Sequence, residues 1–490
     1  MALDPRTPVV VGVASVNQHV DDPAEASEPL DLMEGVLRGA AEDAGSRGLL
    51  ESVDSIWAPR GFWAYSNPGK ILAERFGASG VRTVIAEVGI LQTSVLGRAA
   101  RSIAEGGADV AMIVGAEARD RASRLGRAGR EVPLTEQTDS QPTETMRPHA
   151  EIMGSFEIDL GLTTPVIQYS MIDNALRFHE GQSIEDHRAE LGALWGAFNR
   201  VAVDNPDAWN RMPMSPEEIV TPTDSNRMLS YPYTKSLVSQ WNVNQAGGLI
   251  LCTLEKARRL GLDESRFVYP LAVIDSEHMV TLSERRDLWR SPGFEIASQR
   301  AFEYLGRGPA EIDHFELYSC FPAAVRVQQR AFGIPLSRRV SQTGGMTFGG
   351  GPLNNFVIQA WIKMVERMRD DPGSHGLVTA ISGLITKQGV SVFGPEPSLP
   401  FLHGDVTETV EQASVGIEVE RDAIGRASIS SYTVTYDRTA ANGVAIVADF
   451  DDTRRTLRVV DDPETMELGA REELCGREVE LLAGGGVRWL

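Results

Sequence analysis

The sequence is poor in cysteine, with only Cys252, Cys320 and Cys475 among 490 residues. The three thiols are odd in number and widely separated, which excludes a disulfide framework and a zinc site built on clustered thiols. The histidines show no metal-ligand spacing either, so we predict no metal site. Thiols this sparse are typical of a reduced compartment, and we expect a cytoplasmic protein.

Long apolar runs and positive charge are also scarce. The apolar runs have the length of a strand, far short of the roughly 20 residues that span a bilayer, and Met1 to Pro5 do not begin a signal peptide. We therefore expect no membrane span. The 47 Lys and Arg are outnumbered by 68 Asp and Glu, which gives a formal charge of −21. This excess of acid disfavours binding to nucleic acid, and any anionic ligand needs a local basic patch.

The sequence instead alternates short apolar strands with amphipathic helices. Continuous apolar runs predict buried strands at 9–13 and 108–115, and helical spacing predicts helices over 30–44 and 93–105. A similar order returns about 260 residues later, with strands near 273–275, 312–318 and 376–382 and helices over 295–305 and 355–369. This order predicts an α/β unit of parallel, doubly covered sheets that is present twice.

Two further regions differ in character from these halves. Residues 118–241 are richer in Arg, Pro, Asn and Met, and we predict a largely helical insertion with a helix over 184–203. After the proline-rich link at 395–400, the apolar period changes to two, which is typical of strands. We therefore divide the chain into a first half (1–117 and 242–262), an insertion (118–241), a second half (263–395) and an additional β domain (401–490).

Three stretches make the first 395 residues resemble the thiolase superfamily, closest to the branch of the thiolase half of sterol carrier protein 2. QTSVLGRAARSIAEGGADVAMIVGAE at 92–117 is similar to the helix and strand that follow the thiolase nucleophile. NVNQAGGLILCTLEKARRLGL at 242–262 is similar to the segment that joins the two thiolase halves, and SQTGGMTFGGGPL at 341–353 to the loop that ends in Gly-His-Pro. The resemblance implies two stacked βαβαβαββ halves in five layers (α-β-α-β-α), an inserted loop domain and a small, loosely OB-like, all-β C-terminal domain.

The same resemblance implies that the thiolase side chains are missing. Gly89 falls at the position of the nucleophilic cysteine, Gly351 at the loop histidine, and Ile381 near the late cysteine. The motif that supplies part of the thiolase oxyanion hole reads Tyr318-Ser319-Cys320-Phe321. Glycine has no side chain to attack with, so thiolysis and Claisen condensation should be negligible.

Other residues offer chemistry around these positions. Tyr318 follows a predicted strand, and a phenol there is suited to bind a thioester oxygen or to transfer a proton. Cys320 is a less favoured nucleophile, because a free cysteine in such a motif is commonly buried and inert. Arg119, Arg121 and Arg124, together with Arg127 and Arg130, form a basic cluster where guanidinium groups would suit the phosphates of coenzyme A.

Three functions fit these residues. The first is a thiolase-like protein, similar to acetyl-CoA acetyltransferases, that handles an acyl-CoA or other acyl thioester in lipid metabolism without an acyl-cysteine. The second is an aldolase or lyase acting on a coenzyme A thioester through Tyr318. The third is a non-catalytic binding protein whose C-terminal β domain contacts a protein partner. The resemblance implies a dimer or tetramer, although the added domain leaves a monomer open, and whether the chain is an enzyme stays open as well.

Overall fold

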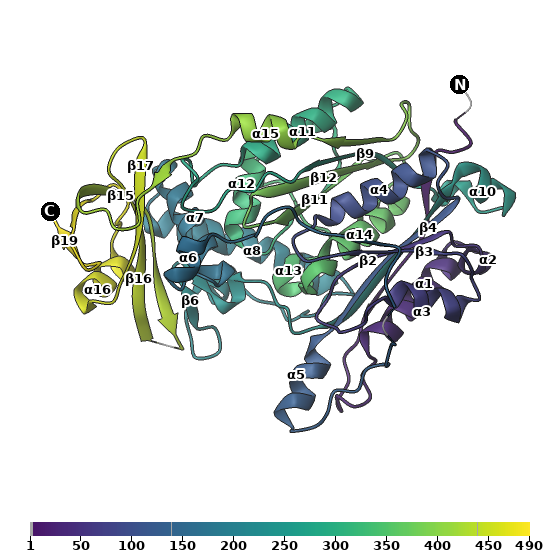
Figure 1. The fold of residues 1–490 in the computed structure, drawn as a ribbon, viewed down its shortest axis with the longest axis horizontal. Helices are drawn as coiled ribbons and strands as arrows, with labels where there is room; N and C mark the ends of the chain where they lie inside the picture. Colours follow the sequence, from purple (N-terminus) through teal and green to yellow (C-terminus); the bar gives the residue numbers. More distant parts are fainter. Residues whose placement is uncertain (1–2, 139, 439) are drawn as a thin grey trace.

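The computed structural model describes residues 3–138, 140–438 and 440–490. The protein contains two mixed β-sheets, one from each half of the first 413 residues, and a third sheet at the C-terminal end of the molecule (Figure 1). Helices cover and separate the first two sheets. The doubled α/β architecture expected from the sequence is therefore present, but the prediction of parallel sheets was wrong, because antiparallel β8 (Asn244–Thr253) and β12 (Lys387–Gly394) lie within them.

The first half builds a six-stranded sheet whose middle strands are apolar because both faces are covered. Every residue of β4 and β8 is buried. Neighbouring strands pair in the order β1-β8-β4-β2-β3-β5, with β8 antiparallel to both β1 and β4, and the remaining pairs parallel. The strands are β1 (Pro8–Asn17), β2 (Ser55–Pro59), β3 (Arg82–Ala86), β4 (Val110–Ala118), β5 (Glu144–Met146) and β8 (Asn244–Thr253).

The second half builds a five-stranded sheet in the order β10-β11-β12-β9-β13. Its central strands β9 and β12 are also buried along their whole length. The strands are β9 (Tyr269–Ser276), β10 (His314–Glu316), β11 (Gly376–Ser382), β12 (Lys387–Gly394) and β13 (Leu402–Asp405). The last strand pairs in parallel with β9, so this sheet includes a segment from beyond the proline-rich link.

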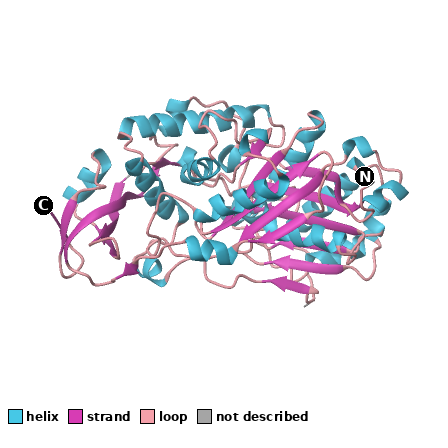
Figure 2. Ribbon diagram, turned by 90° about the horizontal axis from the view of Figure 1, so that it is seen from above, coloured by secondary structure: helices cyan, strands magenta, loops and turns pink. Residues whose placement is uncertain are grey.

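Helices form three layers around these sheets, which confirms the expected five-layer stack (Figure 1), and Figure 2 looks down on this stack from above. α4 and α14 lie between the two sheets, and each contacts strands of both. α1 and α3 cover the outer face of the first sheet, while α11 covers that of the second and packs against α12. The helices are α1 (Pro29–Asp43), α3 (Pro68–Phe76), α4 (Gln92–Ala104), α11 (Pro292–Leu305), α12 (Pro322–Phe332) and α14 (Phe356–Asp370).

Local sequence signals explain where these helices begin and end. Ser291 caps α11 by accepting a hydrogen bond from the Phe294 amide, and Pro292 occupies the first turn, where no amide donor is needed. Gly306 ends α11 in the left-handed conformation that glycine adopts at little cost. The helices predicted at 93–105 and 355–369 are found within one residue of those bounds.

The insertion between β4 and β8 was predicted to be largely helical, but helices α5 to α9 make up less than half of it, and long extended segments and the strands β5, β6 and β7 make up much of the rest. Its longest helix, α8 (Ile184–Asp204), matches the prediction of 184–203. α5 (Arg119–Arg127) projects from the body of the molecule, as Figure 1 shows, whereas α7 (Pro165–His179) packs against α12 and against the C-terminal domain. The other elements are α6 (Ser155–Asp159), α9 (Pro216–Val220), β6 (Met228–Ser230) and β7 (Tyr233–Thr234).

The C-terminal domain is a mainly antiparallel sheet in the order β14-β17-β16-β15-β18-β19. One helix, α16 (Pro463–Arg471), packs on β15 and β16, and the inserted strand β6 pairs with β15. The strands are β14 (Glu418–Val419), β15 (Gly425–Asp437), β16 (Ala440–Asp449), β17 (Arg454–Val460), β18 (Glu478–Leu481) and β19 (Val487–Trp489).

Two details differ from the expected strand pattern. The strand predicted over 312–318 is only three residues long, because the Leu317 amide donates to Val340 and the Tyr318 amide to the side-chain hydroxyl of Thr379 instead of to a backbone carbonyl of β11. Residues after the proline-rich link form β13 and α15 (Thr407–Ala413), and both pack on the second half before the C-terminal sheet begins. In the described ranges no helix combines the length and the apolar character needed to cross a bilayer.

Candidate functional site

The positions singled out by the resemblance lie on segments that contact one another between the two halves. The first turn of α4 contacts the loop after Gly351 through Gln92 and Asn354, and β12, which pairs with the strand of Ile381, contacts Gly89 through Lys387. We call Gly89, Tyr318, Gly351 and Ile381 the thiolase-equivalent site. Gly89 precedes α4 and has a φ of +102°, a conformation that residues with a Cβ rarely adopt. A Cβ added there would lie 3.1 Å from the ring of Pro148. The backbone at this position therefore favours glycine and leaves no nucleophile.

The loop that contains Gly351 passes tightly against the start of β8. The Gly351 amide donates a 2.7 Å hydrogen bond to the Gln240 carbonyl, and a Cβ on Gly351 would lie 3.3 Å from that oxygen. Gly350 has a φ of +106°, and a Cβ there would overlap the side-chain amide of Gln245. No imidazole base projects from this loop.

Buried side-chain amides occupy this junction. The Gln92 amide group, in the first turn of α4, donates to the carbonyl and side-chain oxygens of Asn354 at 3.1 and 2.7 Å. Yet Gln92 Oε1, Gln245 Oε1, Asn354 Nδ2 and both polar side-chain atoms of Asn355 have no hydrogen-bond partner among the described residues. Buried polar atoms are nearly always satisfied, so this amide cluster has unused capacity for a polar ligand or water.

The turn between β11 and β12 forms another wall of the site. Ile381 is buried in β11 and pairs with Gln388 of β12. Leu384 and Ile385 in the turn have φ of +58° and +67°, and Leu353 in the loop after Gly351 has +45°. Across the described chain only four non-glycine residues have positive φ, and three of them lie in these two loops. Strain of this kind collects at functional sites because the surroundings must enforce it.

Lys387 lies at the start of β12 and was not among the residues predicted from the sequence. Its Nζ donates a 3.1 Å hydrogen bond to the carbonyl of Gly89, the residue that the resemblance aligns with the thiolase nucleophile. The only sequence signal is a single lysine within the otherwise uncharged run TKQGVSVFG.

Tyr318 lies two residues beyond β10, with its ring edge-on to Phe356 at 5.7 Å between centroids. Its hydroxyl makes no hydrogen bond to any described residue. Burial, and the nearby Cys320 to a smaller extent, raise the pKa of the Tyr318 phenol well above its ordinary value of 10. The phenol therefore stays protonated near neutral pH, which suits it to donate a hydrogen bond and not to act as a base.

The three thiols are all buried. Burial raises the pKa of Cys252 and of Cys320 to about 12, and that of Cys475 well above its ordinary value of 9. A thiolate is the reactive form of cysteine, so these protonated thiols are poor nucleophiles.

The arginines of the basic cluster do not converge on one point. Arg121 is buried and donates to the carbonyls of Ala26 and Pro133. Arg124 donates to the carbonyls of Val20 and Asp21. Both therefore fasten α5 to residues 20–26, a structural task that the sequence did not reveal.

Arg119 instead contacts an exposed aromatic pair. Its guanidinium lies 3.9 Å from the ring centroid of Trp241 and 4.6 Å from that of Phe62, and these rings are 47% and 52% exposed. Trp241 directly follows Gln240, which accepts the Gly351 amide. This trio forms a rim beside the thiolase-equivalent site, where a cation between aromatic faces is well placed to meet a planar or anionic ligand group.

A buried carboxyl lies behind this rim. Burial raises the pKa of Glu117 to about 7, although the hydrogen bond from the Phe62 amide and the charge of Arg119 both act to lower it. Glu117 thus titrates near neutral pH.

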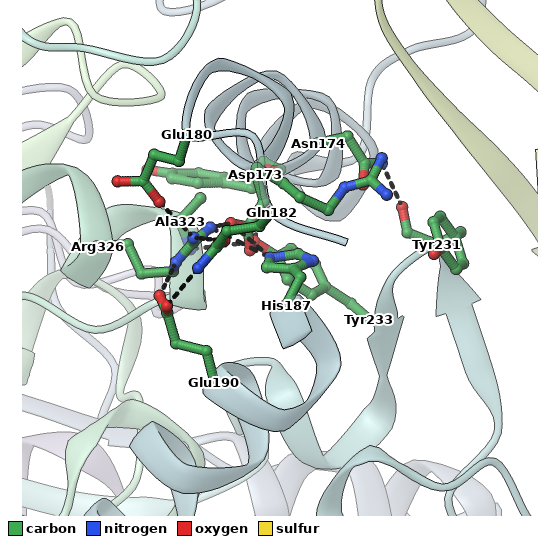
Figure 3. A network of polar contacts seen from close by, with 12 residues as sticks. Asp173, Asn174, Glu180, Gln182, His187, Glu190, Tyr231, Tyr233, Ala323 and Arg326 are labelled. Atoms are coloured by element: carbon green, nitrogen blue, oxygen red, sulfur yellow. Dashed lines mark hydrogen bonds and ion pairs between the residues drawn. The ribbon is translucent and has the colours of Figure 1, made fainter. Parts of the chain in front are cut away.

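A network of charged side chains supports the turn that contains Tyr318 and Cys320 (Figure 3). Asp173 of α7 accepts a 2.6 Å hydrogen bond from the Tyr233 hydroxyl, which in turn accepts the amide of Ala323 at 3.0 Å. Arg326 of α12 pairs with Asp173 and also with Glu190, which lies 2.7 Å away. Because Ala323 lies in the first turn of α12, the network fixes where the Tyr318 turn enters that helix.

The charges in this network depend on one another. Burial alone would raise the pKa of Asp173, but Arg326, His187 and Tyr233 hold it well below its ordinary value. Asp173 and Arg326 are both fully buried, so the loss of Arg326 leaves the Asp173 carboxylate without its arginine partner in the interior. Loss of Asp173 leaves Arg326 with only the partly buried carboxylates of Glu180 and Glu190.

The layered halves, the inserted helical region and the site at their junction define a thiolase-like fold. A scan of family models finds no match to this sequence, and a search of curated protein sequences also finds none. Among solved structures, the chain is similar over its full length to a monomeric SCP2-thiolase-like protein type 1 from Mycobacterium smegmatis. The two chains are 27% identical, the TM-score is 0.83, and all of each chain is covered.

Other solved structures match the fold over a smaller part of this chain. The Ltp2-ChsH2(DUF35) aldolase matches with a TM-score of 0.59 and 17% identity, and the acetyl-CoA acetyltransferase of Syntrophomonas wolfei with 0.57 and 15%. Each match covers 80% of this chain and 99% of the other. The remaining fifth corresponds in length to the C-terminal region, which the full-length match to the mycobacterial protein includes.

Proposed function

We propose that this protein binds an acyl thioester of coenzyme A at the thiolase-equivalent site without forming an acyl-cysteine. The observation that carries the proposal is Gly89: the fold is that of thiolases, yet the backbone at the nucleophile position favours glycine. The protonated thiols of Cys252, Cys320 and Cys475 offer no substitute. Coenzyme A or acyl-CoA is then a ligand, and no resident cofactor is required.

The site offers contacts of the right kind for such a ligand. The amide cluster around Gln92 and Asn354 has free donors and acceptors for a polar acyl or pantetheine group. Arg119 is flanked by the aromatic rings of Phe62 and Trp241, which suits the nucleotide end. We place this activity in lipid metabolism and in the cytoplasm, where sparse, reduced thiols are expected.

The proposal is tested by calorimetric titration with coenzyme A, acetyl-CoA and a long or sterol-like acyl-CoA, followed by intact mass measurement. We expect binding without a covalent acyl adduct. An acyl group retained on the protein, or thiolase turnover, would overturn the statement about mechanism. No heat and no thermal stabilisation with any of the three would overturn the ligand assignment and favour a non-catalytic protein that acts through its C-terminal domain.

A second candidate is carbon–carbon bond cleavage of a β-hydroxyacyl thioester. It is favoured by the unpartnered hydroxyl of Tyr318 and by the similarity in fold to the Ltp2-ChsH2(DUF35) aldolase. In this retro-aldol step a base removes the hydroxyl proton, the bond between the α and β carbons breaks, and the electron pair forms a thioester enolate. The β carbon leaves as an aldehyde or ketone, and the enolate is then protonated at carbon.

Tyr318 would stabilise the enolate by donating a hydrogen bond to the enolate oxygen. The raised pKa of the phenol keeps it protonated, so Tyr318 cannot act as the base. We expect Tyr318→Phe to lower lyase turnover about 100-fold or more, as when an oxyanion-hole donor is removed. Coenzyme A affinity should not change. Full lyase activity in Tyr318→Phe would remove this candidate role, and wild-type protein without any lyase activity would remove the candidate function.

A further inference from the structure

Lys387 is a cation enclosed by the protein without a charged partner. Its exposed fraction is 1%, and the described part of the chain contains no carboxylate that forms an ion pair with its Nζ. Burial lowers the pKa of its ammonium group below the ordinary value of 10.5, and only the more distant charge of Glu277 opposes this. A buried lysine with no charged partner suggests a function, because the uncompensated charge costs free energy of folding.

The strand geometry directs this side chain toward α4. Residues two apart in a strand share a face of the sheet, so Lys387 and Gly389 point the same way. A Cβ added to Gly389 would lie 1.9 Å from the Thr93 hydroxyl, and Thr93 belongs to the first turn of α4. Lys387 therefore faces the central helical layer and the site between the halves.

At the end of this side chain, two N–H groups are left over. An ammonium group has three donors, and the structure assigns one of them to the Gly89 carbonyl at 3.1 Å. The amine thus lies one hydrogen bond from the backbone of the residue that lacks the thiolase nucleophile. An acyl group delivered to that position would bring its carbonyl oxygen to the unused donors.

We propose that Lys387 binds the carbonyl oxygen of the acyl thioester and stabilises the negative charge that this oxygen acquires as an enolate. The inference rests on the proposed function and names the group that contacts the acyl part of the ligand. A single amine with two free donors suits one carbonyl or enolate oxygen, whereas a phosphate is better matched by guanidinium forks such as Arg119. The strained turn at Leu384 and Ile385, which enters β12, fixes the direction of the lysine.

The test compares two probes that differ only in this oxygen: an acyl-CoA, and the matching S-alkyl-CoA thioether that lacks the carbonyl. Wild-type protein should bind the acyl-CoA about 10- to 100-fold more tightly, the factor expected for a hydrogen bond from a charged donor. Lys387→Met should remove that preference and bind the thioether as wild type does. Lys70→Met is the matched control, because Lys70 is exposed on α3, and it should keep the preference.

Different results would overturn the role of Lys387 and the proposed binding of an acyl thioester. Wild-type protein that binds neither probe overturns the proposed function and the inference together. Wild-type protein that binds both probes equally, or a folded Lys387→Met that keeps the preference, overturns only the assignment of Lys387. Met is expected to fold, because it replaces a buried cation with an apolar chain of similar length. Lys387→Gln provides a second neutral variant for the same comparison, and its retention of the full preference would equally overturn the assignment.

Discussion

A cysteine placed at position 89 should not produce thiolase activity, and it should lower the stability of the protein. The φ of +102° costs a residue with a Cβ about 1–2 kcal/mol. The added Cβ would also lie 3.1 and 3.2 Å from the rigid ring of Pro148, tighter than ordinary van der Waals contact. Together these terms predict that Gly89→Ala and Gly89→Cys each lose about 2–3 kcal/mol of unfolding free energy.

Urea-induced unfolding, followed by fluorescence, measures this loss as a shift of the midpoint at an unchanged slope. Gly35→Ala is the matched control, because Gly35 lies exposed in α1 with nothing within 4 Å of the added Cβ. It should gain up to about 1 kcal/mol, as glycine is unfavourable inside a helix. If Gly89→Ala were as stable as wild type, the argument that the backbone requires glycine would be refuted.

Acylation of the Gly89→Cys variant is measured by mass spectrometry after incubation with acetyl-CoA. Gly89→Cys should remain unacylated, because position 351 is a glycine and no imidazole is present in that loop to take the proton of the thiol. Rapid acylation of the new cysteine would show that a base is present in the site after all.

Two further predictions concern buried charges. Glu117 has a pKa of about 7 in the folded protein against 4.5 unfolded, so the contribution of this one group to stability is fully present below pH 4.5 and is lost, by about 3 kcal/mol, as the pH rises through 7. Glu117→Gln should remove that part of the slope in urea midpoints measured from pH 4.5 to 8, and an unchanged slope would contradict the buried position of this carboxyl. Asp173→Asn should cost about 2–3 kcal/mol, because Arg326 and Tyr233 lose hydrogen bonds to a buried carboxylate while Arg326 keeps the partly buried Glu180 and Glu190. The exposed ion pair of Glu42 provides the control, and Glu42→Gln should change stability by less than about 1 kcal/mol; equal effects of the two substitutions would refute the argument.

The fold was readable from the sequence because its signals are local. The apolar run at 108–115 and the spacing over 93–105 each depend on neighbouring residues, and β4 and α4 lie within a few residues of those ranges. The length of β10 was overestimated, because the amides of Leu317 and Tyr318 just beyond it donate to Val340 and Thr379, and no local sequence pattern indicates these partners.

The sequence predicted individual candidate residues of the site, but not the contacts between residues that are far apart in the chain. The resemblance placed Gly89 and Gly351, but the role of Lys387 depends on a contact between residues nearly 300 apart in sequence. The arginine cluster in the sequence suggested a single phosphate-binding site. In the structure, Arg121 and Arg124 instead donate hydrogen bonds to carbonyls of residues 20–26 and Pro133. Charge that is clustered along a chain need not be clustered in space.

Consecutive residues of α7 face two different parts of the protein. Asp173 holds Arg326 and Tyr233 at the entrance of α12, while the side-chain amide of Asn174 donates 2.8 Å to the Tyr432 carbonyl in the C-terminal domain. Ser230 and Thr433 add a buried hydroxyl pair at the same boundary. A shortened chain ending after α15 would therefore remove the partners of α7 in the C-terminal domain. The position of the Tyr318 turn depends on the opposite side of the same helix. The last domain is in this sense a structural support of α7, and through α7 of the start of α12.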